Sequence, residues 1–224
     1  MHKGTRKLAT EAGWRLSSIL RSARYFSLPE VFRLYKAYVL SYIEHCLTGY
    51  YHAADAALSQ IDRVQTRFLK AVGISEVEAL IRFRLAPLKL RRDIAILGFL
   101  HRVTLDLVSP QLQALFPKVG LRDLPAGIAG RSRFARRYHN KQLQDRVTRS
   151  SAEVFKRSVF GMVECYNSLP RRIVDLPTVS ALQRSLQDSC IRRANEGNPH
   201  WQSIFSDGRR YASLIEFQVY FEQM

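Results

Sequence analysis

Residues 27–46, SLPEVFRLYKAYVLSYIEHC, predict a long amphipathic helix. Ser27 and Glu30 have the spacing of a capping box, in which each side chain bonds to the backbone N–H of the other residue. Pro29 falls in the first turn, where the N–H that proline lacks would have no helical partner. Gly49 is expected to end the helix. Apolar side chains recur at intervals of three and four residues and share one face, namely Val31, Leu34, Tyr35, Tyr38, Val39, Tyr42, Ile43 and Cys46.

An apolar face of this length needs a partner, and residues 53–72 predict a second helix that can supply it. Gly73 follows this segment, and glycine readily adopts the left-handed conformation that ends helices. We expect the two helices to form a core together. The inward positions of the second helix are Leu58, Ile61, Val64, Phe68, Leu69 and Val72.

Further helices are expected along the rest of the chain. Ser75 and Glu78 repeat the capping-box spacing before a short helix that reaches Phe83, and Pro87 opens a longer one. The longer helix has an apolar face, with Arg91, Arg92 and Arg102 on its other faces, and that apolar face consists of Leu90, Ile94, Leu97, Leu100 and His101. Additional helical patterns cover residues 109–117, 154–166, 178–190 and 211–221. No convincing pair of strands is present, so the predicted fold class is all-α.

The middle of the chain differs from both ends. Residues 118–150 contain several glycines and little apolar periodicity, and residues 121–160 carry ten Lys or Arg against three acids. We therefore predict three parts: a helical bundle at residues 1–117, a basic irregular loop at 118–150 and a second small helical unit at 151–224.

Charge is the most informative global property. Thirty-five basic and nineteen acidic residues give a net charge of +16 and a pI near 10.3, and 27 of the basic residues are Arg. A folded chain this basic is typical of proteins that bind a polyanion, nucleic acid first and anionic membrane second. The Arg excess taken alone is also what GC-rich coding sequence produces. The longest stretch without a charged residue is 11 residues, at 107–117, which is too short to span a bilayer.

Motifs for catalysis and metal binding are missing. No two acidic residues are adjacent, and the phosphate-binding and nucleophile-elbow glycine motifs do not occur. The three cysteines form no paired zinc motif, and Gly49 separates His45 and Cys46 from His52. We therefore expect no metal, no cofactor and no enzymatic activity. An odd number of dispersed cysteines indicates a reducing, intracellular compartment, the nucleus or the cytoplasm.

The first 26 residues carry six Lys or Arg and one acid, Glu11, together with Trp14, Leu16, Ile19 and Leu20. This composition predicts a basic amphipathic helix. It fits either the first helix of the domain or a mitochondrial presequence, which is also rich in Arg and Ser and poor in acids.

Several stretches, taken in order, resemble the C-terminal part of reverse transcriptases from LINE-type (non-LTR) retrotransposons. Residues 34–46, LYKAYVLSYIEHC, are similar to the thumb helix of that family, and residues 61–68, IDRVQTRF, follow at the family's spacing. Residues 85–93, LAPLKLRRD, and 166–170, YNSLP, resemble two later segments. Together these stretches lie between residues 14 and 190, which is most of the chain.

The sequence also departs from the family. Tyr166 stands where Trp is usual, and Leu182-Gln183 stands where Phe-Lys is usual. The palm and fingers, with their Asp-Asp catalytic motif, would lie upstream of Met1. The resemblance therefore implies a fragment or degenerate copy that does not polymerise DNA by itself.

The role that the resemblance implies is to hold a template–primer duplex of RNA or DNA through its backbone, against the missing palm and fingers. Candidate phosphate ligands are Arg91, Arg92, Arg131, Arg133, Arg136, Arg137, Lys141, Arg171 and Arg172. The alternatives are a non-enzymatic interaction module for a protein or an anionic membrane, and an enzyme whose pocket gathers His45, His101 or Glu44. The position of the positive charge discriminates between them, because a basic stripe favours nucleic acid, whereas a single amphipathic helix favours a membrane.

Overall fold

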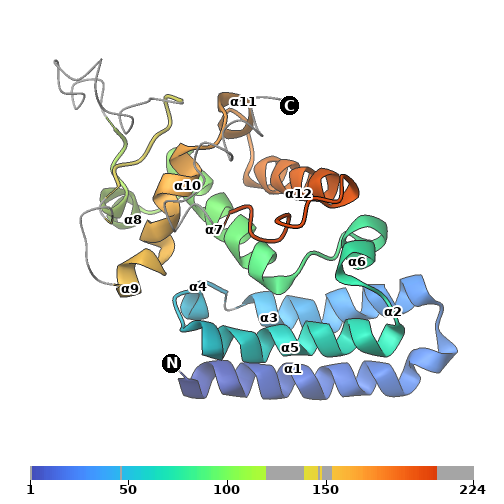
Figure 1. Ribbon diagram of the computed structural model, residues 1–224. Coiled ribbons are helices and arrows are strands. Elements are labelled where there is room, and N and C mark those ends of the chain that lie inside the picture. Colours follow the sequence, from blue (N-terminus) through green and yellow to red (C-terminus); the bar gives the residue numbers. More distant parts are fainter. Residues whose placement is uncertain (1, 46, 120–138, 146, 148–152, 206–224) are drawn as a thin grey trace. The chain divides into compact units, whose positions relative to one another are not determined.

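The computed structural model describes residues 2–45, 47–119, 139–145, 147 and 153–205 (Figure 1). The secondary-structure elements of these residues are all helices, which confirms the predicted all-α class. The chain divides into two compact units, and neither unit is continuous in sequence. Unit 1 comprises Met1–Arg92 and Cys190–Gln202, and unit 2 comprises Asp93–Ser189 and Ser203–Met224. The sequence predicted three consecutive parts instead, because local patterns do not show that residues 190–202 return to the first unit.

Unit 1 is built on three long helical stretches. They are α1 (His2–Ser22), extended by a 3-10 turn (Ala23–Tyr25), the run α2 (Leu28–Leu34), η2 (Tyr35–Leu40) and α3 (Ser41–His45), and α5 (Asp55–Val72). Helix α1 packs along α5 and along the α2–α3 run. Two shorter helices, α4 (Leu47–Tyr50) and α6 (Glu76–Phe83), complete this part of the unit.

The expected core between the α2–α3 run and α5 is confirmed. The ring of Phe68 stacks on Tyr35 at 4.0 Å between centroids and meets Phe32 edge-on at 5.0 Å. Phe83 of α6 stacks on Phe32, with 3.8 Å between the ring centroids. Gly73 ends α5 in the left-handed conformation, with φ of 69°. Aromatic rings thus join three helices of unit 1.

The middle of the α2–α3 run corrects the predicted apolar stripe. Residues 35–40 form a π-helical segment, in which the N–H of Ser41 bonds to the carbonyl of Lys36. The wider turn changes the register after Tyr35, so Val39 and Leu40 are both buried whereas Tyr38 is 48% exposed. The other difference concerns Gly49, which was expected to end the helix but lies inside α4.

Capping agrees with the sequence at both predicted sites. Glu30 accepts the backbone N–H of Ser27 at 2.7 Å, and Ser75 Oγ accepts the N–H of Glu78 at 3.1 Å. These bonds satisfy helix-end groups that would otherwise need water. They fix where α2 and α6 begin.

Two helices contribute to both units. Helix α7 (Leu88–Thr104) starts in unit 1, and its apolar face is buried as predicted. Helix α12 (Val179–Asn195) begins at the predicted cap, where Thr178 Oγ1 accepts the N–H of Ala181 at 3.2 Å. No helix in the described part of the chain is both long and apolar enough to cross a membrane.

Unit 2 also contains α8 (Pro110–Leu115), α9 (Glu153–Lys156), η3 (Val159–Met162), α10 (Val163–Asn167) and α11 (Arg171–Val174). The single helix expected over residues 154–166 is therefore wrong. The helix is interrupted at Ser158, and the chain continues as a 3-10 turn, because Ser158 Oγ accepts a hydrogen bond from the N–H of Phe160 at 3.2 Å. A Cβ at Gly161 would collide with the carbonyl oxygen of Lys156, so only glycine fits this turn.

Part of the segment predicted as an irregular loop is ordered and buried. Lys118 and Leu143 form an antiparallel bridge, and the Leu143 side chain is fully buried. The Asn167 side chain binds both the N–H and the carbonyl of Leu143, at 2.9 and 2.8 Å. The rest of the loop, residues 120–138, 146 and 148–150, lies outside the described residues.

Candidate nucleic-acid interface

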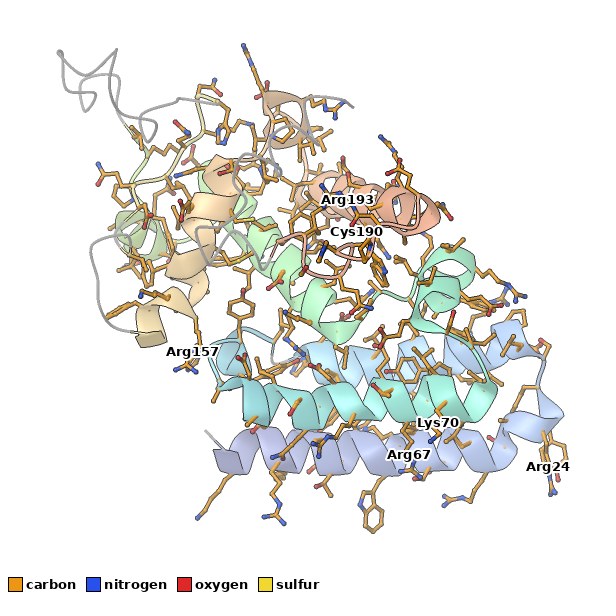
Figure 2. All side chains as sticks on the ribbon, in the orientation of Figure 1. Arg24, Arg67, Lys70, Arg157, Cys190 and Arg193 are labelled. Atoms are coloured by element: carbon orange, nitrogen blue, oxygen red, sulfur yellow. The ribbon has the colours of Figure 1, made fainter. Side chains whose placement is uncertain are left out.

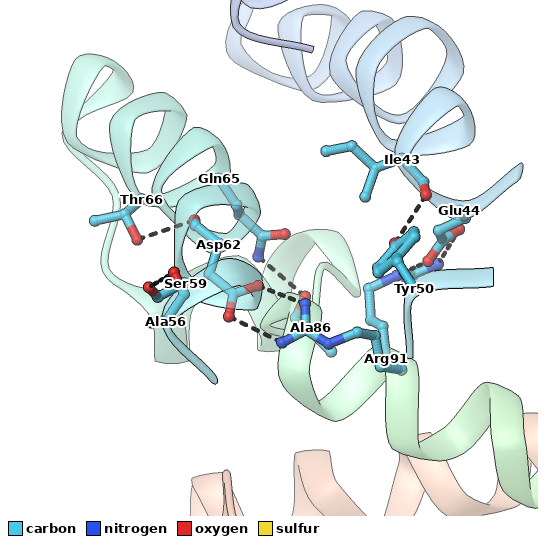
Figure 3. A network of polar contacts seen from close by, with 11 residues as sticks. Ile43, Glu44, Tyr50, Ala56, Ser59, Asp62, Gln65, Thr66, Ala86 and Arg91 are labelled. Carbon is cyan, nitrogen blue, oxygen red and sulfur yellow. Dashed lines mark hydrogen bonds and ion pairs between the residues drawn. The ribbon is translucent and has the colours of Figure 1, made fainter. Parts of the chain in front are cut away.

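Two of the predicted phosphate ligands are held in ion pairs within unit 1 (Figure 3). Arg92 donates two hydrogen bonds to the carboxylate of Asp62, at 2.5 and 2.9 Å. The Arg92 side chain is only 4% exposed. Arg91 donates two hydrogen bonds to the carboxylate of Glu44 in the same way, at 2.5 and 3.0 Å. The prediction that Arg92 faces away from the core is wrong. In this conformation both guanidinium groups connect the start of α7 to neighbouring helices.

These ion pairs surround a buried tyrosine. The hydroxyl of Tyr35 has no hydrogen-bond partner among the described residues. Burial raises its pKa, and the nearby Glu44 and Asp62 carboxylates add to that rise while Arg91 opposes it. The Tyr35 hydroxyl therefore stays neutral and belongs to the core.

The remaining predicted ligands are distributed over unit 2. Lys141 is half-buried and donates to the carbonyl of Val174 at 2.8 Å. Arg171 is 74% exposed and pairs with Asp175 at 3.1 Å, and the neighbouring Arg172 is exposed. The four arginines predicted in the loop, Arg131, Arg133, Arg136 and Arg137, lie outside the described residues.

The sequence did not mark α1 as a site, although its outer face is strongly basic. Lys3, Lys7, Trp14 and Arg21 recur at nearly whole helical turns and therefore share one face. All four side chains are exposed. The opposite face carries Ala12, Leu16 and Ile19, which are buried against the rest of the unit. The helix thus presents its cations to solvent rather than to the core.

Helix α5 carries a second basic stripe beside the first. Arg63, Arg67 and Lys70 are exposed and follow one another at intervals of four and three residues. Arg67 donates to Ser17 Oγ of α1 at 3.3 Å, so this stripe borders α1. Figure 2 labels Arg67 and Lys70 on α5 where it runs along α1, and Arg24 beyond the end of α1.

We name this surface the α1–α5 basic face and define it by its exposed cations, which are Lys3, Arg6, Lys7, Arg21, Arg24, Arg63, Arg67 and Lys70. Within the described residues, only Lys7 has a carboxylate partner, Glu11, at 3.8 Å. The carboxylate of Glu11 also accepts a hydrogen bond from Tyr42. Seven of the eight cations thus have no counterion in the described part of the chain.

Arg15 lies on another side of α1 and, unlike the cations of the α1–α5 basic face, is in contact with two tyrosine rings. Its guanidinium lies 4.1 Å from the ring centre of Tyr42 and 4.7 Å from that of Tyr38. It also donates to the carbonyl of Tyr38 at 3.3 Å. These contacts hold α1 to the α2–α3 run, so Arg15 is not part of the α1–α5 basic face.

Of the residues considered for an enzyme pocket, His101 and Glu44 are held by hydrogen bonds and an ion pair to their neighbours. His101 is fully buried in unit 2, where its Nε2 lies 3.0 Å from the carbonyl of Leu176 and its Nδ1 lies 3.0 Å from the hydroxyl of Tyr166. The carbonyl can only accept, so Nε2 carries the proton and Nδ1 accepts from Tyr166. Burial lowers the pKa of His101 and raises that of Tyr166 to about 12, which keeps both groups neutral.

The other two candidates lie in unit 1. His45 is exposed, and Glu44 is bound by Arg91. No group of His, Cys, Asp and Glu within the described ranges is arranged to hold a metal ion.

The sequence signal that could have found the α1–α5 basic face is present in α1 itself. Its basic residues alternate with buried apolar residues at helical spacing, and one acid interrupts them. In comparisons with protein-family models, with curated proteins and with solved structures, the chain matches none.

Proposed function

We propose that this protein binds the phosphate backbone of nucleic acid through the α1–α5 basic face, with little dependence on sequence and without chemistry of its own. The observation that carries the proposal is the set of seven exposed cations on α1, its 3-10 extension and α5 that have no carboxylate partner among the residues that the structure describes. Unpaired surface cations repel one another, and a polyanion that neutralises them releases its own counterions.

The type of cation supports phosphate as the ligand. Five of the eight residues are Arg, whose planar fork can donate two hydrogen bonds to one phosphate group. Contacts with phosphate oxygens carry no direct sequence information, so binding should be nearly independent of sequence.

The sequence resemblance supports the same class of function. In this proposal the chain is a fragment of a retroelement reverse transcriptase that lacks the catalytic palm. Two of the resembling segments, residues 34–46 and 61–68, coincide with the helices whose Tyr35 and Phe68 rings stack in unit 1. The basic face would then hold nucleic acid for a palm that this sequence does not include.

The test is a salt titration of binding to a duplex, measured by fluorescence anisotropy. With about four to six phosphates neutralised, log K should fall against log salt with a slope of about −3 to −5. The test variant replaces Lys3, Arg6, Arg63 and Lys70 by Gln, because none of these four has a hydrogen bond or ion pair through its side chain in the described structure. It should flatten the slope by about two to four units.

The matched control removes the same charge elsewhere. Lys89, Arg102, Arg184 and Arg192 are also exposed and lie on α7 and α12. Replacing these four by Gln should change the slope by less than about one unit. Equal effects of the two variants would show that net charge, rather than the α1–α5 basic face, governs binding, and a parent protein that binds no duplex and no single strand would overturn the proposal.

A further inference from the structure

Two aromatic side chains are exposed to solvent among the cations of the α1–α5 basic face. Trp14 is 76% exposed and Tyr25 is 72% exposed, the largest values among the large hydrophobic side chains described. Tryptophan is usually well buried, and burying a ring of this size contributes more than burying most other side chains. Trp14 shares its helix face with Lys3, Lys7 and Arg21.

Tyr25 is held in place from one side. The guanidinium of Arg24 lies 4.7 Å from the ring centre of Tyr25, and one of its nitrogens donates to the Tyr25 hydroxyl at 2.6 Å. One face of the ring is therefore covered by a cation, and the exposure of Tyr25 leaves the other face free. A flat group that stacks there would complete a sandwich with Arg24.

The surroundings of Trp14 argue against a lipid ligand. Its neighbours one turn away on the exposed face are Thr10 and Ser18, both polar. Of the other apolar residues of α1, Ala12, Leu16 and Ile19 are buried in unit 1, and Leu8, Ala9 and Leu20 are half-buried. A helix that inserts into a membrane surface needs an exposed apolar face of its own. A single open ring among cations instead suits a ligand that carries negative charges and separate flat groups.

Unpaired nucleobases provide such flat groups. Open rings beside a basic groove or face are the means by which proteins hold single-stranded nucleic acid without reading its sequence. In a duplex the bases already stack on one another, and a ring on a convex helix reaches a base face only after a costly unstacking. Trp14 and Tyr25 are eleven residues apart, which is about 16 Å along a helix, so they would hold two bases that are not neighbours.

We propose that the ligand of the α1–α5 basic face is single-stranded nucleic acid, whose bases stack on Trp14 and on the open side of Tyr25. This inference rests on the proposed function, because the cations hold the phosphates. It differs from the role that the sequence resemblance implies, in which a template–primer duplex is held.

The experiment compares a dT oligonucleotide of ~16 nucleotides with a hairpin duplex of equal phosphate number, in anisotropy titrations at one salt concentration. Trp14→Ala and Tyr25→Ala should each weaken binding of the single strand about fivefold or more and leave duplex binding within about twofold. Trp14→Phe keeps a smaller ring and should fall between the parent and Trp14→Ala. Phe155→Ala, which removes an exposed ring from unit 2, is the control and should change neither affinity.

Tryptophan fluorescence gives a second readout. The chain has two Trp residues, and Trp201 is only 5% exposed, so stacking should quench the emission of Trp14. The quenching should disappear in Trp14→Phe.

The outcomes separate the two proposals. Unchanged single-strand binding in Trp14→Ala and Tyr25→Ala, or an equal loss on both ligands, would overturn the stacking inference and leave backbone binding intact. A parent protein that binds neither nucleic acid, but binds anionic vesicles with a blue shift of Trp14 emission, would overturn both.

Discussion

At the scale of single residues, the arginines fall into two groups that the sequence does not distinguish. Arg91 and Arg92 meet carboxylates that lie 47 and 30 positions away in the chain, whereas Arg63 and Arg67 meet none among the residues with a described structure. The excess of positive charge could be predicted from composition. Which cations are neutralised inside the fold could not, because their partners are brought close only by tertiary packing.

The buried pair gives a stability prediction at this scale. Asp62→Ala removes the carboxylate that neutralises Arg92, whose side chain is 4% exposed, and should destabilise the protein by about 2–4 kcal/mol. Arg92→Met removes the buried charge itself and leaves Asp62 partly solvated, so it should cost less. Asp175→Ala breaks an exposed pair and should cost under about 1 kcal/mol. Urea denaturation measures all three, and equal costs for Asp62→Ala and Asp175→Ala would contradict the assignment.

At the scale of helices, the elements with a regular apolar period could be predicted from the sequence, whereas departures from regular helix geometry could not. Helices α5 and α6 and the inner faces of α7 and α12 follow from spacing and caps. The π-helical segment of residues 35–40 does not, because a stripe of Tyr and Val fits either register. The break at Ser158 depends on the close approach of Gly161 to a carbonyl, which no local pattern reveals.

The packing of the α2–α3 run against α5 can be tested by two truncations that the sequence treats as equal. Phe68 is fully buried between Tyr35 and Phe32, so Phe68→Ala should cost about 3–5 kcal/mol. Leu34 is only half-buried, so Leu34→Ala should cost about 1 kcal/mol. Thermal or urea unfolding gives both values, and similar costs would contradict the difference in burial between Phe68 and Leu34.

At the scale of the whole molecule, positive charge is present both on the α1–α5 basic face and in the arginine cluster of residues 131–137. The sequence predicted only the second of these as a binding site, because a cluster within a few residues is visible without a structure. The face is assembled from α1 with its 3-10 extension and from α5, and the basic residues of these two segments lie at least 39 positions apart.

We expect the two charged regions to make separable contributions to nucleic-acid binding. Replacing Arg131, Arg133, Arg136 and Arg137 together by Gln should flatten the salt dependence of duplex binding by about two units or more. Circular dichroism should show unchanged helix content, since these residues lie in the segment without apolar periodicity. If this variant binds as tightly and as salt-sensitively as the parent, the cluster takes no part in binding and the α1–α5 basic face accounts for it alone.

The π-helical segment also bears on how this chain can change during evolution. A turn closed by a bond five residues back holds one residue more than the ordinary turn closed four residues back. Losing one residue there would restore regular α-helical geometry without opening the helix, and Val39 and Leu40 would still lie next to the apolar face. A length change is therefore possible in the middle of a core helix, where insertions and deletions are normally excluded. In an alignment with related chains, a gap between residues 35 and 40 would mark this turn and would not indicate a loop.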